Sequence, residues 1–424
     1  MYNQLGKSID DEHTNLSRQP RVLFVAGFLA GDEGISSHLV SLAKGLREHG
    51  WKVALAANML DRKGSDKELV HSSQWLESVG VQYFFVPFPK FRVSVNNVAD
   101  AFKSLQRFDM IIRQFKPDII HTHSISVCPY INILRLVYKI PFVTTCHMDI
   151  EAKINRSEVK IGAFVGRYVK SFLGNKVIAV SRELQENFQR IMKVPSENIR
   201  LILHGIEENR FRIPSSEERF EVRKALNIEP DSKVVCLIGR LDPVKGHDIL
   251  IHALSILKAN GINAIAICAG TGSEIGKNTI RAKASEAGVA NLVRLLGYAD
   301  ARQVLWASDV IVLPSRREAF GLVIAEAMLC GVVPVRTPTA GTIDQIEDGI
   351  NGFIIPFDDP EALALRLKQL LKNDELRIQM STAAIKSAQF KFTADRMTKD
   401  TIALYKEAID ENSHLLETGK ILKT

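Results

Sequence analysis

Short apolar runs alternate with longer amphipathic stretches along almost the whole chain. In the first half, each apolar run is bounded by turn-forming or polar residues: 21–29, 52–58, 83–88, 118–124, 142–147, 176–181 and 199–205. Runs of this kind are typical of buried parallel strands, and the segments between them have mostly the length of crossover helices. The pattern therefore predicts an α/β fold.

A second series of apolar runs begins near residue 234. It consists of 234–240, 264–270, 293–297, 310–315, 332–336 and 352–356, and beyond Pro360 the pattern is helical to near the end. Ligands of doubly wound sheets bind beyond the carboxyl ends of the strands. We therefore predict two Rossmann-like domains that face each other across a cleft, with the chemistry in that cleft.

The segment 207–233 separates the two series. It is charged, contains two prolines and has no strand pattern, so we expect an interdomain linker with a short helix. The predicted organisation is a disordered lead-in at 1–20, which lacks the apolar core of a secretory signal, a first domain at 21–206 and a second at 207–390. The remainder, 391–424, is expected to form a helix that packs back toward the first domain.

The cysteines and the apolar runs favour a cytoplasmic protein. No apolar run approaches the ~20 residues that span a membrane. None of the five cysteines forms a CxxC pair, and three lie inside apolar runs, which is typical of buried, reduced thiols. Reduced thiols indicate a reducing compartment.

The positive charge is concentrated in the first half of the chain. Of the 55 basic and 48 acidic residues, 27 and 19 lie at or before Arg200, which leaves 28 and 29 after it. An excess of this kind indicates an anionic partner, either a phosphorylated substrate or a membrane surface. At helical spacing, a basic stripe at 153–170 contains Lys153, Lys160 and Arg167. It is either a solvated helix face or a peripheral contact with an anionic membrane.

The densest polar signal is SRREAFGLVIAEAMLCG, residues 315–331. Glu318 directly follows an apolar run, Gly321 allows a tight turn, and Glu326 falls in an early turn of the helix that follows. A carboxylate accepts two hydroxyl hydrogen bonds at once, which suits the diols of sugars and ribose. The alternative is a pair of solvated charges, but the surrounding motif favours a binding site.

A second signal, LIGRLDPVKG, places two cations between a strand and a helix. Arg240 ends the strand, and Lys245 and Gly246 open the helix. A guanidinium, an ammonium and a helix N-terminus together form a good site for a diphosphate. Ordinary basic residues in a loop are the alternative interpretation.

Glycines and histidines mark the strand ends of the first half. Gly31 and Gly34 allow close backbone approach at a helix start, but the loop is not GxGxxG and lacks the acidic partner of nicotinamide sites. His121, His123 and His147 also end strands. We expect His121 to pack inside and His147 to hydrogen-bond a sugar hydroxyl. A metal site is the weaker alternative, since no HxxxH or HExxH helix accompanies them.

Taken together, these motifs resemble the retaining glycosyltransferases of family 4, which have the GT-B fold of two Rossmann-like domains. The resemblance extends from about Arg21 to Tyr405, and its most specific parts are GRLDPVKG and EAFGLVIAE in this order. It implies that the first domain faces the acceptor and that the second binds the nucleotide sugar.

The resemblance also implies individual roles. In such enzymes the basic pair, here Arg240 and Lys245, binds the donor diphosphate. The first glutamate, Glu318, contacts the donor sugar, and the second, Glu326, contacts the ribose. These four residues are the core of the predicted donor site.

Further residues are implied around this core. His147 lies near the transferred sugar, and Gly34 touches the phosphates or the acceptor. Backbone amides that follow Phe320 and Gly321, including that of Leu322, help to hold the sugar and phosphate.

Three departures from the family pattern concern the same region. The usual Gly-Gly of the first loop is Glu33-Gly34, the usual Asn-Gly-Ile-Asp is His204 to Glu207, and the usual Gly-Gly-x-Pro-Glu is the segment 340–344. Each departure is expected to alter the preference for donor or acceptor, and none removes the basic pair or the glutamate pair.

The function that this resemblance implies is transfer of a sugar, with retention, from a nucleotide sugar, on family precedent a UDP-sugar. The acceptor is a hydroxyl of a polysaccharide, glycolipid or small glycoside, lipid-linked acceptors included. No cofactor, metal or nucleic acid is expected, and the enzyme would be cytoplasmic or peripheral at the inner membrane face. The alternatives are another GT-B enzyme, such as a sugar-nucleotide epimerase or phosphorylase, and a non-catalytic nucleotide-sugar-binding protein.

Overall fold

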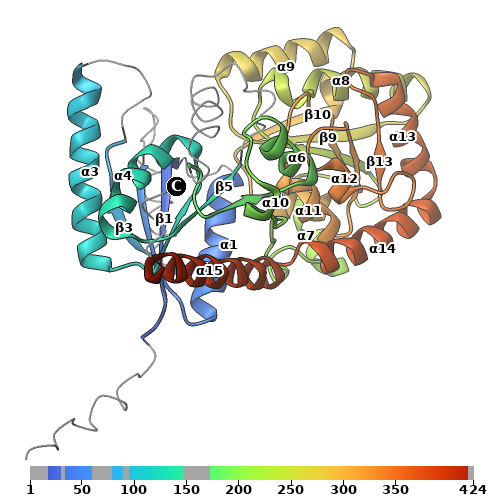
Figure 1. The fold of residues 1–424 in the computed structure, drawn as a ribbon. Helices are drawn as coiled ribbons and strands as arrows, with labels where there is room; N and C mark the ends of the chain where they lie inside the picture. Colours follow the sequence, from blue (N-terminus) through green and yellow to red (C-terminus); the bar gives the residue numbers. More distant parts are fainter. Residues whose placement is uncertain (1–17, 30–33, 60–78, 89–94, 148–171, 419–424) are drawn as a thin grey trace, which may run out of the picture.

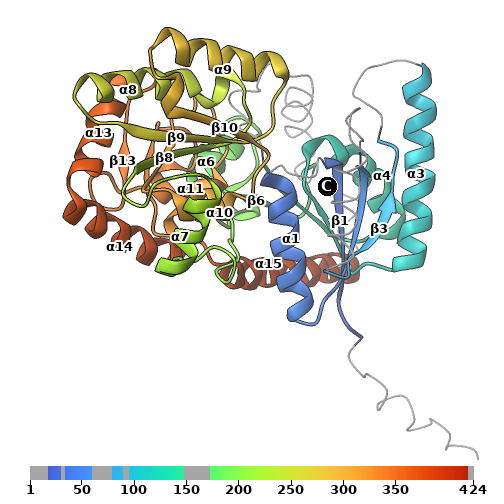
Figure 2. The ribbon, with the colours of Figure 1, turned by 180° about the vertical axis from the view of Figure 1, so that it is seen from behind.

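The computed structural model describes residues 18–29, 34–59, 79–88, 95–147 and 172–418. They form two parallel β-sheets that lie side by side, each flanked by helices (Figures 1 and 2). Each of the apolar runs identified in the sequence overlaps one of the strands. The predicted fold class, two Rossmann-like α/β domains, is therefore confirmed.

The first sheet has seven strands in the order β3-β2-β1-β4-β5-β6-β7. Its strands are β1 (Arg21–Leu29), β2 (Lys52–Met59), β3 (Gln82–Phe85), β4 (Ile119–Thr122), β5 (Phe142–Cys146), β6 (Lys176–Ala179) and β7 (Ile199–Leu201). The helices among these strands, within the residues that the structure describes, are α1 (Gly34–Glu48), α3 (Val95–Phe115), α4 (Cys128–Tyr138) and α6 (Arg182–Arg190).

The second sheet has six strands in the order β10-β9-β8-β11-β12-β13. Its strands are β8 (Lys233–Ile238), β9 (Ala264–Ala269), β10 (Val293–Gly297), β11 (Val310–Leu313), β12 (Val333–Arg336) and β13 (Phe353–Ile354). The helices in this half are α7 (Ser216–Ala225), α8 (His247–Ala259), α9 (Glu274–Glu286), α10 (Ala301–Ala307), α11 (Leu322–Leu329), α12 (Thr342–Gln345), α13 (Pro360–Lys372) and α14 (Asp374–Lys391).

Strand order identifies the point in each sheet where a ligand is expected. In both sheets the chain winds outward from a central strand in one direction and then returns to wind in the other. The reversal falls between β1 and β4 in the first sheet and between β8 and β11 in the second. Helices on opposite faces diverge at such a point and leave a crevice at the carboxyl ends of the strands. Loops after β8 and β11 therefore border the predicted donor site.

The apolar runs become strands because both of their faces are covered. In β1, Val22, Leu23 and Val25 have no exposed surface, and Val234 and Val235 of β8 are equally buried. Alternate side chains of a strand point to opposite faces, so a fully buried run requires helices on both sides. This is why these segments lack the alternating polar pattern of a half-exposed sheet.

The last helix, α15 (Ala394–Glu417), returns to the first sheet and runs along one side of the molecule (Figure 1). It packs against α1 and β5, and its Tyr405 is fully buried beside Trp51. The backbone at Ile206 hydrogen-bonds Phe392 and Ala394 on either side of the crossing, at 2.8 and 3.0 Å. The C-terminal segment thereby ties the two halves together.

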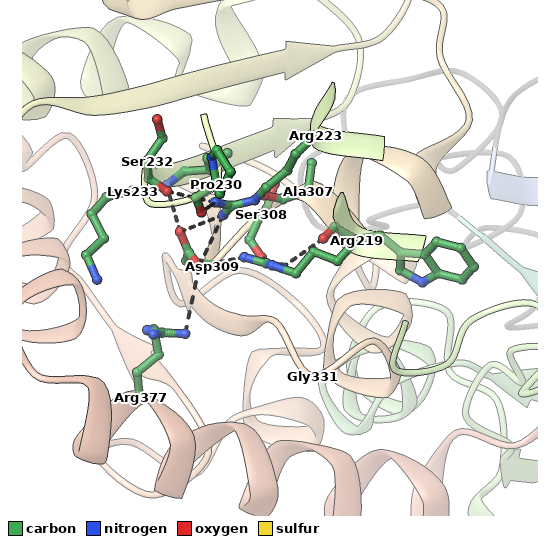
Figure 3. Close-up of polar contacts among 12 residues, drawn as sticks. Arg219, Arg223, Pro230, Ser232, Lys233, Ala307, Ser308, Asp309, Gly331 and Arg377 are labelled. Atoms are coloured by element: carbon green, nitrogen blue, oxygen red, sulfur yellow. Dashed lines mark hydrogen bonds and ion pairs between the residues drawn. The ribbon is translucent and has the colours of Figure 1, made fainter. Parts of the chain in front are cut away.

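A cluster of arginines lies at the amino-terminal edge of the second sheet, opposite the carboxyl ends of its strands (Figure 3). The Asp309 carboxylate, 7% exposed, accepts a hydrogen bond from the backbone of Val234 at 2.8 Å and pairs with Arg219, Arg223 and Arg377 at 2.7, 3.3 and 3.8 Å. Arg223 also donates to three backbone carbonyls. This cluster fastens α7 and α14 to the sheet, at the edge away from the predicted donor site.

The cysteines agree with the sequence prediction. All five are buried and free, and burial raises the pKa of Cys236 and Cys268 to about 12. They are therefore core residues rather than reactive thiols. Within the described residues, no helix combines the length and the apolarity needed to cross a membrane.

Candidate active site

The predicted diphosphate-binding lysine and the predicted sugar-binding glutamate form an ion pair. Lys245 Nζ lies 2.6 Å from Glu318 Oε1, and the two side chains are only 18% and 10% exposed. Lys245 follows β8 and Glu318 follows β11, so they meet at the strand reversal of the second sheet. The ammonium and the carboxylate offset each other's charge in this partly enclosed place.

Two glycines shape the loops that carry this pair. Gly246 has φ +72°, and a Cβ on it would lie 2.2 Å from the carbonyl oxygen of Pro314 at the end of β11. Gly321 has φ +76° and directly precedes helix α11. Both positions require the left-handed conformation that glycine adopts without strain. A larger residue at Gly246 would force the loop after β8 away from the loop after β11, and one at Gly321 would crowd Leu313 and Arg336.

Arg240 lies beside this pair in sequence but is held less firmly. Its side chain is 55% exposed and lies 3.4 Å from Asp242, a surface ion pair of small energetic value. The side chain of Lys245, by contrast, packs over Gly239, with its Cδ and Cε 3.4 Å from where a Cβ would stand. The guanidinium of Arg240 is thus less restrained by the protein than the ammonium of Lys245.

Glu326 lies in α11, one turn beyond the N-terminus of that helix, and is partly buried. Burial raises the pKa of its carboxyl to about 7, opposed by the positive charge of Arg210 and reinforced by the negative charge of Asp300. A carboxyl with this pKa is poised between its neutral and charged forms at physiological pH.

Five histidines form one cluster at the carboxyl edge of the first sheet. His123 Nδ1 lies 3.2 Å from His147 Nε2, and His38 Nδ1 lies 2.9 Å from His204 Nδ1. His121 is fully buried between the hydroxyls of Tyr405 and Thr145, at 2.6 and 2.7 Å, which agrees with the expectation that it packs inside. The structure therefore brings together histidines from α1 and from the ends of β4, β5 and β7.

Burial keeps the histidine cluster uncharged. It lowers the pKa of His38 to about 3 and holds the pKa of the other four well below the usual value, because the rings lose water and a second charge nearby would repel. Ring nitrogens of His38, His123 and His147 lie within 4.8 Å of one another, a spacing that a metal ion could use. The expectation that catalysis needs no metal remains a prediction.

The two sheets meet at these residues. The His204 ring packs edge-on against Phe320 of the second half, with centroids 5.0 Å apart. Gly34 opens α1, and a Cβ on it would lie 3.0 Å from the side chain of Leu322. The carboxyl ends of both sheets, with the basic pair on one side and the histidine cluster on the other, therefore border the same region.

Comparison with known proteins decides the family. The model of glycosyl transferases group 1 matches residues 218–387, and that of glycosyltransferase family 4 matches residues 33–210. The chain belongs to the group 1 glycosyltransferases. The family 4 model matches the half that contains the first sheet, and the group 1 model matches the half that contains the second sheet.

Relatives in sequence carry related names. An uncharacterized glycosyltransferase, MJ1607, from Methanocaldococcus jannaschii is 27% identical over 70% of this chain and 76% of its own. A D-inositol 3-phosphate glycosyltransferase from Saccharomonospora viridis is 28% identical over 69% of this chain and 70% of its own.

Solved structures share the fold of the glycosyltransferase. Anabaena Alr3699/HepE, in complex with UDP and glucose, superposes with a TM-score of 0.76 at 22% identity and covers 92% of this chain and all of its own. Sucrose-phosphate synthase from Thermosynechococcus elongatus gives a TM-score of 0.75 at 18% identity, with the same coverage.

Two departures from the family pattern have structural explanations in the glycosyltransferase. Asp344, in the slot of the usual glutamate, is 1% exposed at its side chain and accepts a hydrogen bond from the backbone of Arg182 at 3.0 Å. Glu207 pairs with Lys44 at 2.7 Å. Both acids thus serve contacts within the protein, and burial raises the pKa of Asp344. Glu33 lies outside the described residues.

Sequence reasoning missed two residues that the structure places near this region, His38 and Arg336. His38 joins the histidine cluster beside His204, which the sequence marked as a departure from the family pattern, and Arg336 is buried beneath the Phe320 loop. A charged residue at the end of an apolar run, as in VVPVR, was the available signal for Arg336. The basic stripe at 153–170 lies outside the described residues.

Proposed function

We propose that this glycosyltransferase transfers a sugar, with retention of configuration, from a UDP-sugar to a hydroxyl group of an acceptor. The observation that carries the proposal is the Lys245–Glu318 pair, buried at the strand reversal of the second sheet and opposite the histidine cluster. The UDP complexes of Alr3699/HepE, which has the same fold, support UDP as the nucleotide.

In the proposed complex each group of the site has one task. Lys245 releases Glu318 and binds the diphosphate together with Arg240. Glu318, freed from the lysine, accepts hydrogen bonds from sugar hydroxyls, and Glu326 in its ionised form accepts those of the ribose diol. The amides at the N-terminus of α11 point toward a bound anion, as at other helix starts.

The proposed chemical step needs no enzyme nucleophile. The acceptor hydroxyl attacks the anomeric carbon from the face that the diphosphate leaves, and a diphosphate oxygen takes the hydroxyl proton. Arg240 and Lys245 stabilise the negative charge that develops on the leaving group. Removal of one such stabilising contact typically costs ~100- to 1,000-fold in rate. His147, kept neutral by burial, donates or accepts a hydrogen bond at the transferred sugar.

The acceptor binds on the side of the first sheet in this proposal. The excess positive charge of the first half favours an anionic acceptor. The name of the Saccharomonospora viridis relative, a D-inositol 3-phosphate glycosyltransferase, supports a phosphorylated polyol as one class to test. Anionic lipid-linked acceptors are the second class.

A donor panel tests this function. The protein is incubated with UDP-, GDP- and ADP-sugars, with and without candidate acceptors, and free nucleotide and sugar products are measured. Release of UDP with formation of a glycoside is expected. An epimerised nucleotide sugar without UDP release would indicate an epimerase, and unchanged donor in every mixture would indicate a binding protein.

Matched variants separate the site from general damage in the same assay. Lys245→Ala removes a lysine paired at 2.6 Å within the site, whereas Lys277→Ala removes one paired at 2.6 Å with Glu274 on the exposed helix α9. Only the first is expected to abolish UDP release.

A further inference from the structure

Arg336, at the end of β12, is a fully buried cation without a carboxylate partner. Its side chain has 0% exposure, and no ion pair joins it to an acidic group among the described residues. Its hydrogen bonds go instead to neutral oxygens. Nη1 donates to the carbonyl of Phe320 at 3.0 Å and to the side chain of Gln345. Nη2 donates to the hydroxyl of Thr339 at 2.7 Å and the carbonyl of Ala340 at 3.3 Å.

The burial of such a charge costs free energy. An arginine loses its hydration on burial, and neutral acceptors compensate this loss only in part. Burial lowers the pKa of Arg336 to about 10, opposed by the negative charges of Glu318, Glu183 and Asp344, so it stays protonated at neutral pH. Its Nε has no hydrogen-bond partner. The structure thus keeps a fixed positive charge behind the loop that presents Glu318.

The segments that Arg336 joins are the two that surround the proposed sugar position. One is the loop 318–321 after β11. The other is 339–345, which includes the segment 340–344 that differs from the family's usual Gly-Gly-x-Pro-Glu. Gln345, itself bonded to Arg336, also donates to the carbonyl of Gly321 at 3.3 Å. Gly341, with φ +82°, packs so closely on Phe320 that a Cβ would lie 2.9 Å from its Cα. The loop is thus held from beneath by Arg336 and from the side by its partner segment.

We propose that Arg336 is a positioning residue for the donor sugar. It holds the 318–321 loop in the conformation that presents Glu318 to the donor sugar. A guanidinium suits this task because its planar fork can donate to several segments at once, which an ammonium does less well. The inference rests on the proposed function and deepens it.

A selective effect follows from this placement. Arg336 contacts neither Glu326 nor the basic pair, which would hold the nucleoside diphosphate. Loss of its hydrogen bonds should therefore weaken the use of UDP-sugar and leave the binding of UDP nearly intact. Hydrogen bonds from a charged donor imply a loss of about 10- to 100-fold.

The test compares Arg336→Met and Arg336→Lys with Arg223→Met. Arg223 is a matched control, since it is also a buried arginine of this half, 4% exposed, but lies in the cluster around Asp309 (Figure 3). For each protein, calorimetry measures the Kd for UDP, and turnover of the best UDP-sugar of the donor panel gives kcat/KM. Circular dichroism and thermal melting report folding.

Arg336→Met is expected to bind UDP within threefold of wild type and to lose about 10- to 100-fold in kcat/KM, with Arg336→Lys in between. Arg223→Met is expected to lose thermal stability and to keep both quantities within threefold. If Arg336→Met does not fold, Gln345→Ala removes one partner of the guanidinium and should show the same split more weakly.

Unchanged kcat/KM in the Arg336 variants, or equal losses for UDP binding and kcat/KM, would overturn the proposal. Equal losses would mean that Arg336 supports only the fold of this half. A wild-type protein that binds UDP but turns over no UDP-sugar would refute the proposed function, and the role of Arg336 with it. That outcome appears before any variant is measured.

Discussion

Replacing Glu326 with glutamine should remove most of the pH dependence of UDP binding. Because burial raises the pKa of Glu326 to about 7, its carboxyl is largely protonated at pH 6 and largely ionised at pH 8. A carboxylate accepts both hydroxyls of the ribose, whereas the protonated acid has one acceptor position fewer. If only the ionised form binds, the ionised fraction rises from about 9% to about 91% over this interval, so the affinity should rise about tenfold.

Calorimetric titration of UDP at pH 6, 7 and 8 is the assay, for wild type and Glu326→Gln. The phosphate of UDP also titrates, with a pKa near 6 in phosphate monoesters, but it does so identically in both proteins. The ratio of the two affinities therefore isolates the carboxyl. A ratio that stays constant from pH 6 to pH 8 would refute the assignment of Glu326 to the ribose.

The raised pKa of Glu326 also predicts how the stability of the protein depends on pH. A carboxyl whose pKa is raised by folding stabilises the protein fully below its unfolded pKa, near 4.5, and loses this contribution as the pH rises through about 7. The loss is at most about 3 kcal/mol above pH 7. Glu326→Gln should accordingly melt at a higher temperature than wild type at pH 8, with little difference near pH 4.5.

Four further predictions test the site and its surroundings. Arg240→Ala and Lys245→Ala should fold normally and lose ~100-fold or more in turnover, as measured in the donor assay; near-full turnover of both would remove the diphosphate site from the second sheet. Glu318→Ala should leave the calorimetric affinity for UDP nearly unchanged while Glu326→Ala weakens it, and the reverse ranking would exchange their roles. Turnover should persist in excess EDTA; a complete loss that added metal restores would instead point to a metal on His38, His123 and His147. The histidine cluster is neutral in the folded protein, because the pKa values of its members lie below the unfolded value of 6.5. The free energy of unfolding should therefore fall as the pH drops below 6.5, by up to about 1.4 kcal/mol per pH unit for each histidine. An unfolding free energy that stays constant from pH 7 to pH 5 would contradict this.

The strands were predictable from sequence because both sheets are parallel and buried on both faces. Under these conditions each strand becomes a continuous apolar run, such as VIVL before Glu318, and the runs separate cleanly from the helices. The loops after β8 and β11 were predictable as site loops for the same reason, since polar motifs at strand ends stand out against apolar runs.

Contacts between distant segments were not predictable in this way. The pairing of Lys245 with Glu318 depends on strand order, which places β8 beside β11 although β9, β10 and the helices α8, α9 and α10 intervene in sequence. Arg336 was hidden because its acceptors at Phe320 and Gln345 come together only when two loops fold around it. His38 lies on helix α1, whose apolar pattern indicates only a buried face. The histidines around it follow strands that are distant from α1 in sequence.

A crystal structure of the protein with UDP tests the central claim most directly. We predict that the diphosphate lies between Arg240 and the N-terminus of α11, with Lys245 Nζ moved from Glu318 to a phosphate oxygen and the ribose on Glu326. UDP bound elsewhere, or bound with the 2.6 Å Lys245–Glu318 pair intact, would contradict the proposed donor site.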